Sequence, residues 1–290
     1  MRLATRGSAL ALAQAQQVAD ALGGAEVVAV RTGDRDPGDK SRFVRGVERA
    51  ILEGEADLGV HSAKDLPGEL ADELELVGVP GREEAADAFI GVAASFDEVK
   101  QGARIGTSSL RRRAQLLALR EDVEVVPLRG NVDTRLSKLA DGECDGIVLA
   151  VAGLVRLGRE DEISFRFTPA QITPAPGQGC LALEARGDDS ETAAAAGRIT
   201  DRAALVELTA ERAAVGSLGA SCETPVGVCA RFDGEELVVE GFAGLPDGSE
   251  WVRDRVAGDP EQPAALGQAL AERMAAAGAS DILERAAAAG

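Results

Sequence analysis

The stretch Ile105-Gly-Thr-Ser-Ser-Leu-Arg-Arg-Arg-Ala-Gln-Leu116 is the part of the chain that decides its fold. It begins with a β-type fragment, continues through a turn rich in hydroxyl groups, and opens a helix with three consecutive arginines. Backbone N–H groups at a helix start, Ser and Thr hydroxyls and guanidinium groups together form a receptor for carboxylate or phosphate. The stretch therefore predicts a strand–turn–helix unit that binds an anion at its turn.

The remainder of the chain is strongly acidic, which makes this cluster of arginines informative. The 290 residues include 49 acidic and 31 basic ones, and the formal net charge is −18. Because such a protein repels anions at long range, a cationic cluster inside it predicts a specific anionic small-molecule ligand. Only 4 of the basic residues are lysines. Acid richness with few lysines suits a cytoplasm of high salt, where charges are screened over about 3 Å at 1 M; an ordinary acidic bacterial protein is the alternative.

Composition also limits the classes of partner. Aromatic residues make up 3% of the chain and tyrosine is absent, which argues against the basic face and aromatic platforms of a nucleic-acid-binding protein. The sequence contains no apolar run of about 18 residues that could span a membrane. Its first residues lack the apolar core of a signal peptide. We therefore expect a cytoplasmic protein without nucleic-acid or membrane partners.

The cysteines indicate neither a metal centre nor a disulfide framework. Cys144, Cys180, Cys222 and Cys229 form no C-x-x-C pair, and His61 is the single histidine. Zinc sites and disulfide-rich folds need closer or more numerous ligands. We expect no metal, and expect an average cysteine here to be a small buried apolar residue.

Strand-like and helix-like patterns alternate through the first two thirds of the chain. Expected strands lie at residues 27–30, 57–60, 88–92, 123–126 and 146–149, and expected helices at 9–22, 43–53, 110–119, 132–139 and 203–215. Such alternation predicts α/β architecture with largely parallel sheets.

A weak internal similarity predicts two lobes. Residues 3–12 and 105–114 both read as strand, Ser/Thr turn and helix, so each lobe would point a helix N-terminus into a shared cleft. Gly78-Val-Pro-Gly-Arg82 is expected to cross from one lobe to the other, and residues 168–179, rich in Pro and Gly, to cross back.

The last part of the chain has a different pattern. Alternating segments at 226–230, 236–242 and 250–256 predict a short antiparallel sheet. A helix is expected over 263–277, and residues 286–290 are expected to fray.

Several candidate site residues follow strands. His61-Ser-Ala-Lys-Asp-Leu-Pro67 comes after the strand at 57–60, and open α/β sheets bind ligands at the carboxyl ends of their strands. Lys64 and Asp65 offer a cation and a carboxylate within one turn, although a solvated ion pair before proline is an equal alternative. His61 has no evident catalytic partner, and we expect it to be structural.

Further candidates are arginines at strand-to-helix junctions and one loop cysteine. Arg129 and Arg135 flank the start of the helix at 132–139, and Arg156 ends an apolar segment. An isolated arginine is usually a solvated surface residue, but a series at such junctions favours a binding site. Cys222 lies in a turn of small residues, where a thiolate can act as a nucleophile for covalent attachment.

These segments together resemble the porphobilinogen deaminase family, also called hydroxymethylbilane synthase. The resemblance covers nearly the whole chain in order. It is carried by Thr5-Arg-Gly-Ser-Ala-Leu-Ala-Leu12, Val60-His-Ser-Ala-Lys-Asp-Leu-Pro67, Gly106-Thr-Ser-Ser-Leu-Arg-Arg112, Arg129-Gly-Asn-Val-Asp-Thr-Arg-Leu136, Ala152-Gly-Leu-Val-Arg-Leu157, residues 174–184 and the Cys222 turn. Residues 33–43 stand where the family has a longer glycine-rich loop, Ala-Ser-Cys replaces a common Gly-Gly-Cys, and Pro176 replaces a frequent valine.

The resemblance implies an α/β fold of two periplasmic-binding-protein-like lobes with a cleft between them, plus a smaller C-terminal α+β domain with a short antiparallel sheet. The first lobe would comprise residues 1–80 plus 179–198, the second 84–173, and the C-terminal cofactor-attachment domain 201–290. The implied protein is a cytoplasmic monomer.

The implied activity is the stepwise condensation of four porphobilinogen molecules to hydroxymethylbilane, with release of ammonia, in tetrapyrrole and heme biosynthesis. The resemblance places the thioether to a dipyrromethane cofactor on Cys222 and the catalytic carboxylate on Asp65. It places cofactor binding on Lys64, Ser109, Arg111, Arg112, Arg129 and Arg135, and substrate binding on Arg6, Ser8 and Arg156.

The chemistry of the reaction agrees with these residue types. Loss of ammonia from porphobilinogen leaves an electron-poor methylene-pyrrole cation, which a nearby carboxylate stabilises. Each pyrrole also brings two carboxylates, which arginine binds bidentately. The main competing interpretation is a two-lobed solute- or effector-binding module, and a cysteine-dependent amidase is a more distant one. Neither needs a covalent adduct, so intact mass separates them.

Overall fold

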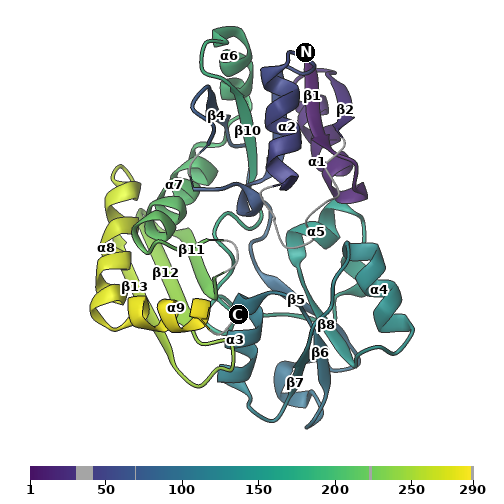
Figure 1. Ribbon diagram of the computed structural model, residues 1–290, viewed down its shortest axis with the longest axis vertical. Coiled ribbons are helices and arrows are strands. Elements are labelled where there is room, and N and C mark those ends of the chain that lie inside the picture. Colours follow the sequence, from purple (N-terminus) through teal and green to yellow (C-terminus); the bar gives the residue numbers. More distant parts are fainter. Residues whose placement is uncertain (31–41, 69, 222–223, 289–290) are drawn as a thin grey trace.

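The computed structural model describes residues 1–30, 42–68, 70–221 and 224–288. Figure 1 shows three parts: an upper lobe that contains the N-terminus, a lower lobe, and a third part beside both. The part of the chain described here contains no helix long and apolar enough to cross a membrane.

The first lobe is built on a mixed five-stranded sheet. Its strand order is β2 (Glu26–Val30), β1 (Arg2–Arg6), β3 (Leu58–Ser62), β10 (Leu181–Arg186) and β4 (Leu74–Gly78). Strand β1 runs parallel to β2 and β3, whereas β10 runs antiparallel to β3 and β4.

Helices α1 (Ala9–Ala21), α2 (Arg42–Leu52) and α6 (Ser190–Arg198) belong to the first lobe. Helix α1 begins at the N-cap Ser8, whose hydroxyl accepts a hydrogen bond from the Ala11 N–H, as short hydroxyl side chains do at helix starts. The core between helices and sheet is aliphatic, with Leu3, Val18, Leu58, Leu183 and others fully buried.

The second lobe repeats this plan. Its strand order is β7 (Glu124–Val126), β6 (Arg104–Gly106), β8 (Gly146–Ala150), β5 (Asp87–Gly91) and β9 (Phe165–Arg166). Strand β6 is parallel to β7 and β8, and β5 is antiparallel to β8 and β9.

Three helices accompany the second sheet: α3 (Leu110–Leu119), α4 (Val132–Ala140) and α5 (Val151–Arg156). The N-caps Ser109 and Asn131 start the first two by accepting hydrogen bonds from backbone N–H groups. One face of the sheet packs on an aromatic cluster that includes Phe89 and Phe167.

The expectation of largely parallel sheets is wrong for half of the strand pairings. The reason lies in the crossings: β5 and β10 enter their sheets from the other lobe, and each enters against the direction of its neighbours. The two crossings themselves are confirmed. Residues 79–86 connect β4 to β5, and residues 167–180 connect β9 to β10.

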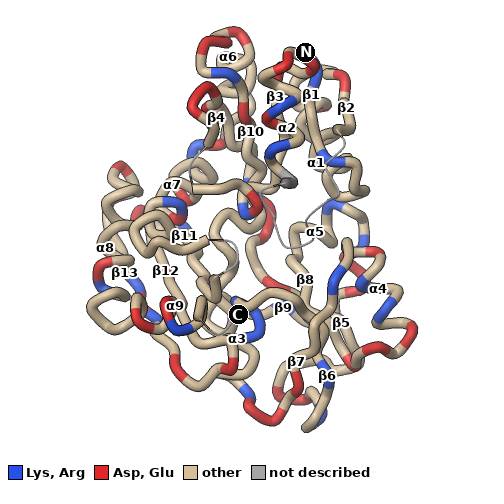
Figure 2. Tube along the Cα trace, in the orientation of Figure 1, with Lys and Arg blue, Asp and Glu red and all other residues tan. Residues whose placement is uncertain are grey.

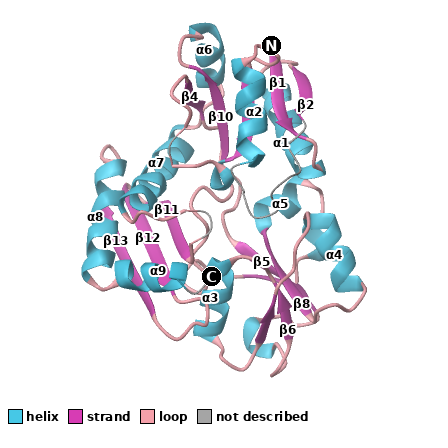
Figure 3. Ribbon diagram, viewed as in Figure 1, coloured by secondary structure: helices cyan, strands magenta, loops and turns pink. Residues whose placement is uncertain are grey.

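The third part contains an antiparallel three-stranded sheet, as predicted. Helix α7 (Arg202–Ser217) precedes β11 (Val226–Asp233), β12 (Glu236–Gly244) and β13 (Trp251–Gly258), which pair in that order. Figure 3 shows this sheet beside the helices that cover it.

Two helices follow this sheet: α8 (Pro263–Ala276), with proline at its first turn, and α9 (Ala279–Ala288). The expectation that residues 286–290 fray is wrong as far as Ala288. Helix α9 continues to that residue because Ile282, Leu283 and Ala286 bury an apolar face. Two α/β lobes with a smaller C-terminal α+β domain are thereby confirmed as the fold class.

Candidate functional site

A cavity of about 540 Å³ lies where the three parts meet. Its lining comes from residues 63–68 after β3, the start of α3, the return crossing, and helix α7 with the segment that follows it. Because segments distant in sequence meet here, the cavity is a product of the tertiary fold.

Lys64 and Asp65 occupy a single 3₁₀ turn (Ala63–Asp65) that follows β3 and lines the cavity. The Asp65 carboxylate lies 3.6 Å from Nη1 of Arg6, and Nζ of Lys64 lies 3.5 Å from Oε1 of Gln178. Burial lowers the pKa of Lys64 to about 8, although Asp65 opposes this effect. A cation and a carboxylate therefore share one edge of the cavity.

The N-terminus of α3 supplies the opposite side. Ser109 caps the helix by accepting from the Arg112 N–H, and Ser109, Arg111 and Arg112 all line the cavity. Both arginines are buried. This end of α3 brings together the hydroxyl and guanidinium groups of the predicted anion receptor, and anion binding there stays a prediction.

Asp87, at the start of β5, joins the two buried arginines. Its carboxylate accepts from Nη1 of Arg111 at 2.7 Å, and from Nε and Nη2 of Arg112 at 3.0 and 2.7 Å. Burial alone would raise the pKa of Asp87, but the charges and hydrogen bonds of the two guanidinium groups hold it well below its usual range. Asp87 is therefore an anion at neutral pH.

Arg135, in α4, brings a further cation to the cavity. Its Nε is buried and has no hydrogen-bond partner in the described ranges. Burial, aided by the charge of Arg112, lowers its pKa to about 10. A buried guanidinium group without a carboxylate is unfavourable unless a ligand supplies the anion.

The remaining predicted arginines and Ser8 do not contribute to the lining of this cavity within the described chain. Arg129 is exposed, and Ser8 caps α1. Arg156 donates from Nη2 to the Gly179 carbonyl at 2.7 Å, and its buried Nε has no partner among the described groups. Arg6 contacts Asp65 at the edge of the cavity. The structure thus brings together six of the predicted residues: Lys64, Asp65, Ser109, Arg111, Arg112 and Arg135.

The predicted attachment residue Cys222 lies outside the described residues, as does most of the segment 33–43 that replaces the family's loop. The residues on either side of the cysteine turn, Ser221 and Thr224, line the cavity. They are joined by a hydrogen bond from the Thr224 hydroxyl to the Ser221 carbonyl at 2.6 Å.

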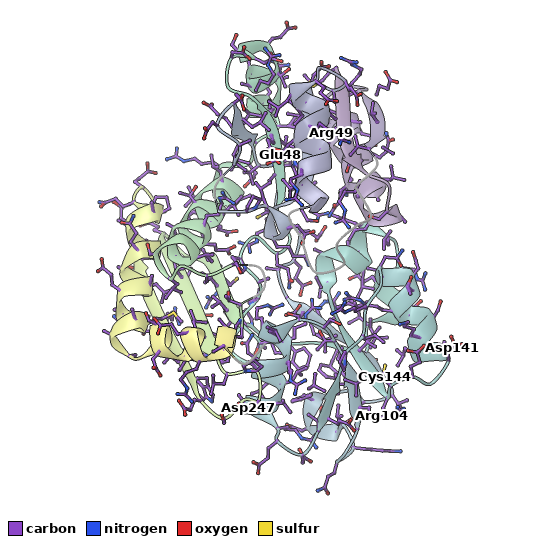
Figure 4. All side chains as sticks on the ribbon, viewed as in Figure 1. Glu48, Arg49, Arg104, Asp141, Cys144 and Asp247 are labelled. Carbon is purple, nitrogen blue, oxygen red and sulfur yellow. The ribbon has the colours of Figure 1, made fainter. Side chains whose placement is uncertain are left out.

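The other three cysteines are buried free thiols, as expected. Burial raises the pKa of Cys180 and of Cys229 to about 12, so both are unreactive at neutral pH. Cys144 lies in the second lobe, in the region of Arg104 (Figure 4). No group of His, Cys, Asp and Glu in the described ranges is arranged to hold a metal ion.

His61 lies away from the cavity lining. Its Nε2 is 2.9 Å from Oε2 of Glu184, and both side chains are buried in the first lobe. This contact agrees with the structural role expected for His61.

Sequence reasoning missed Arg212 and Gln178, which both line the cavity. Arg212 comes from α7 and donates from Nη2 to the Gly68 carbonyl at 2.7 Å, which ties the third part to the first lobe. Burial lowers its pKa. Neither residue stands at a strand-to-helix junction, so the signal that identified the other arginines could not find them.

Comparison with known proteins assigns the chain to a family. The model of the porphobilinogen deaminase dipyrromethane cofactor binding domain matches residues 1–194, and the model of the C-terminal domain of porphobilinogen deaminase matches residues 205–276.

Curated relatives named porphobilinogen deaminase align along almost their whole length. The protein of Syntrophus aciditrophicus is 41% identical over 299 residues, covering 98% of both chains. That of Roseiflexus sp. strain RS-1 is 43% identical over 296 residues, covering 97% of both chains. That of Desulforudis audaxviator is 44% identical, covering 97% of this chain and 96% of its own.

Solved structures give a weaker likeness. The VFT2 domain of BvgS from Bordetella pertussis matches with a TM-score of 0.41 and 15% identity, over 69% of this chain and 85% of that one. A periplasmic binding protein with high arginine specificity from Salmonella typhimurium matches with a TM-score of 0.39 and 11% identity, over 71% of this chain and 93% of that one. The fold therefore rests on the sheet topology described above, while the two family models and the relatives that align along almost the full length show that this chain belongs to the porphobilinogen deaminase family.

Proposed function

We propose that this protein is a transferase that joins four porphobilinogen molecules stepwise to hydroxymethylbilane, releases ammonia at each step, and extends a covalently attached dipyrromethane primer. The observation that carries this function is the cavity in which Lys64, Asp65 and four arginines converge. A cluster of cations in a chain of net charge −18 requires an anionic ligand, and a polycarboxylate pyrrole has the matching chemistry.

The residues present suit a dipyrromethane. Its two pyrroles carry four carboxylates, and the cavity offers Lys64, Arg111, Arg112 and Arg135 as cations. The buried Nε of Arg135, which has no partner in the described chain, marks a place where an anion is needed. When bound, the dipyrromethane supplies a nucleophilic pyrrole carbon to which the first substrate is joined.

Asp65 is proposed as the catalytic carboxylate. It stands at the cavity edge at the carboxyl end of β3 and is about one-third exposed. There it can hold the pyrrole N–H groups and offset the positive charge that develops as ammonia leaves. The contact with Arg6 holds the side chain in place, and Lys64 beside it can bind a carboxylate of the incoming ring.

We assign cofactor binding to Lys64, Ser109, Arg111, Arg112, Arg129 and Arg135, covalent attachment to Cys222, and substrate binding to Arg6, Ser8 and Arg156. Support is strongest for the side chains that line the cavity. For Arg156, support comes from a buried Nε without a partner among the described residues.

We also propose the domain division 1–80 plus 179–198, 84–173 and 201–290. The membership of β10 in the first sheet supports a discontinuous first lobe. We also propose a monomer as the working form. A cytoplasmic location is supported by the free thiols of the three described cysteines, which suit a reducing compartment.

Intact mass spectrometry tests the proposed function. The wild-type protein should carry the mass of two porphobilinogen units less two ammonias, and should release ammonia when given porphobilinogen. Cys222→Ala should have the mass of the polypeptide alone and no turnover. The control Cys229→Ala changes a buried thiol outside the cavity lining and should keep the adduct. An adduct that persists in Cys222→Ala contradicts the attachment site, and a wild type that never acquires one contradicts the function.

A further inference from the structure

Asp87 is fully buried, does not line the cavity, and yet contacts the groups that do. Besides the two arginines, Gln178 donates from Nε2 to its Oδ1 at 2.9 Å. The same amide nitrogen donates to the Ala85 carbonyl at 2.6 Å. Gln178 of the return crossing therefore contacts both Asp87 and Ala85, which belongs to the outgoing crossing.

Arg111 and Arg112 differ in how many of their nitrogens are hydrogen-bonded to the protein. Arg112 is fully engaged with protein: Nε and Nη2 donate to Asp87, and Nη1 donates to the Val148 carbonyl at 2.8 Å. Arg111 uses only Nη1, which donates to Asp87 and to the Thr173 carbonyl, both at 2.7 Å. Its Nε and Nη2 make no hydrogen bond within the described ranges.

We propose that Asp87 is a positioning residue for the carboxylate receptor of the cavity. Asp87 holds Arg112 and Nη1 of Arg111 by hydrogen bonds, and thereby directs Nε and Nη2 of Arg111 at the ligand. It also reduces the net charge of the cluster from +2 for the two arginines to +1. The inference rests on the proposed function, because the carboxylate that Arg111 receives is taken to be that of a pyrrole.

Electrostatics explains why the carboxylate is needed. Burial and the positive charge of Arg112 lower the pKa of Arg111, and the same two causes lower the pKa of Arg135. Without an anion between them, the two guanidinium groups would separate or turn toward other acceptors. A receptor whose donors are fixed before the ligand arrives binds it with less loss of conformational entropy.

The proposal concerns the first covalent step most directly. In that step the Cys222 sulfur bonds to the methylene carbon of porphobilinogen, the carbon–nitrogen bond breaks, and the amine leaves as ammonia with the thiol proton. A second porphobilinogen then joins the first with loss of a second ammonia. The carboxylates of these rings must be held while the bonds form.

The test is the rate at which the full-length protein acquires the two-ring adduct. Protein made in cells that lack porphobilinogen is incubated with it, and the adduct is timed by intact mass. Asp87→Asn keeps the shape and removes the charge, and should load about tenfold more slowly or worse, with a higher half-saturating porphobilinogen concentration. The matched control is Asp122→Asn, which breaks the two-point pair with Arg120 at the far end of α3, outside the cavity; it should load like wild type.

The possible outcomes distinguish failure of the proposed function from failure of the positioning role of Asp87. If wild type acquires no adduct, the proposed function fails. If wild type and Asp87→Asn load at the same rate and the same half-saturating concentration, the function stands and the positioning role is overturned. A purely structural role would lower the melting temperature of Asp87→Asn without moving the half-saturating concentration of its folded fraction.

A second variant covers the case in which Asp87→Asn does not fold. Gln178→Met removes the amide donor to Asp87 and Ala85, and also the Oε1 that lies 3.5 Å from Nζ of Lys64. It leaves Asp87, Arg111 and Arg112 in place and should fold. It frees Oδ1 of Asp87 from the return crossing and should raise the half-saturating concentration several-fold. Loading of Gln178→Met that matches wild type overturns the proposal.

Discussion

At the scale of single residues, two side chains of the same type in one sequence motif can differ in burial in the folded protein. Arg129 and Arg135 belong to one motif, yet Arg129 is exposed and Arg135 lines the cavity with a buried Nε. Arg135 lies within α4 and lines the cavity, whereas Arg129 precedes that helix and is not part of the described lining. Binding energy should therefore be concentrated in Arg135, because desolvated ionic contacts are stronger than exposed ones.

Asp65→Asn should leave the fold intact and remove most of the turnover. The side chain is part-exposed at a strand end, so its removal spares the core. A neutral amide cannot offset the developing cation, and we expect a loss of about a hundredfold or more in kcat. The control Asp161→Asn changes an exposed carboxylate elsewhere. Near-normal kcat in an Asp65→Asn protein that carries the adduct would exclude the catalytic role.

Lys64 should make substrate capture sensitive to alkaline pH. Burial lowers its pKa to about 8, so the ammonium is present below that pH and is lost as pH rises through it. Loss of a charge-assisted hydrogen bond of about 1.5–3 kcal/mol should raise KM about tenfold or more between pH 7 and pH 9.

The lowered pKa of Lys64 has the opposite effect on the free energy of unfolding. Between pH 8 and the ordinary pKa of 10.5, the unfolded chain binds more protons at Lys64 than the folded chain, so the contribution of this group to stability rises with pH. Lys64→Arg keeps its charge throughout and should abolish the step in KM. An unchanged pH profile of KM in that variant would assign the step to another group.

At the scale of elements, the sequence predicted six of the nine helices in the described ranges and the main strands, because capping residues and apolar periodicity are local signals; it did not predict α5, α6 or α9. Ser109 and Asn131 start α3 and α4 where the pattern placed them. The apolar run after Gly146 was harder, since β8 ends at Ala150 and α5 begins at Val151 without any polar boundary.

The direction of strands and the partners of buried charges could not be predicted. Nothing in the sequence around β10 says that it enters the first sheet antiparallel to β3. The contact of Asp87 with Arg111 and Arg112 likewise depends on the register between β5 and α3. Arg212 reaches the cavity only because α7 packs against the first lobe. These contacts depend on how segments distant in the sequence pack together, and no local pattern in the sequence indicates that packing.

The two crossings touch at Gly179, and this contact predicts a sharp sensitivity. Gly179 has φ of 91°, and a Cβ there would lie 2.1 Å from the Glu83 carbonyl oxygen of the other crossing. Gly179→Ala should destabilise the protein by about 3 kcal/mol or more, from backbone strain plus the clash.

The matched control for this variant is Gly142→Ala. Gly142 has φ of 76° with open space around its Cβ position, so it should cost only about 1 kcal/mol from strain. Urea unfolding measures both free energies. Equal losses in the two variants would show that the crossings part easily and that their contact contributes nothing to stability.

At the scale of the whole molecule, the net negative charge opposes the capture of the anionic substrate of the proposed function. Figure 2 shows acidic residues over all three parts of the protein, and the net charge is −18. The substrate is itself an anion in the proposed function, so the field of the molecule repels it while the cavity attracts it. Which influence dominates depends on distance, because long-range repulsion is screened by salt far more than contacts inside a half-enclosed cavity.

Added salt should therefore raise both stability and substrate capture. Surface repulsion decays over about 10 Å at 0.1 M salt and about 3 Å at 1 M. The contacts of Arg111, Arg112 and Arg135 lie in a cavity where side chains are largely buried, so the same salt weakens them less. A thermal melt and a porphobilinogen-consumption assay across a KCl series measure the two effects. Asp87→Asn removes one negative charge beside the cavity and leaves the surface unchanged. The change of its melting temperature with salt should therefore match that of wild type. If melting temperature and substrate capture are both highest at the lowest salt, self-repulsion is not what limits this protein, and its acidic surface has no bearing on how it gathers substrate.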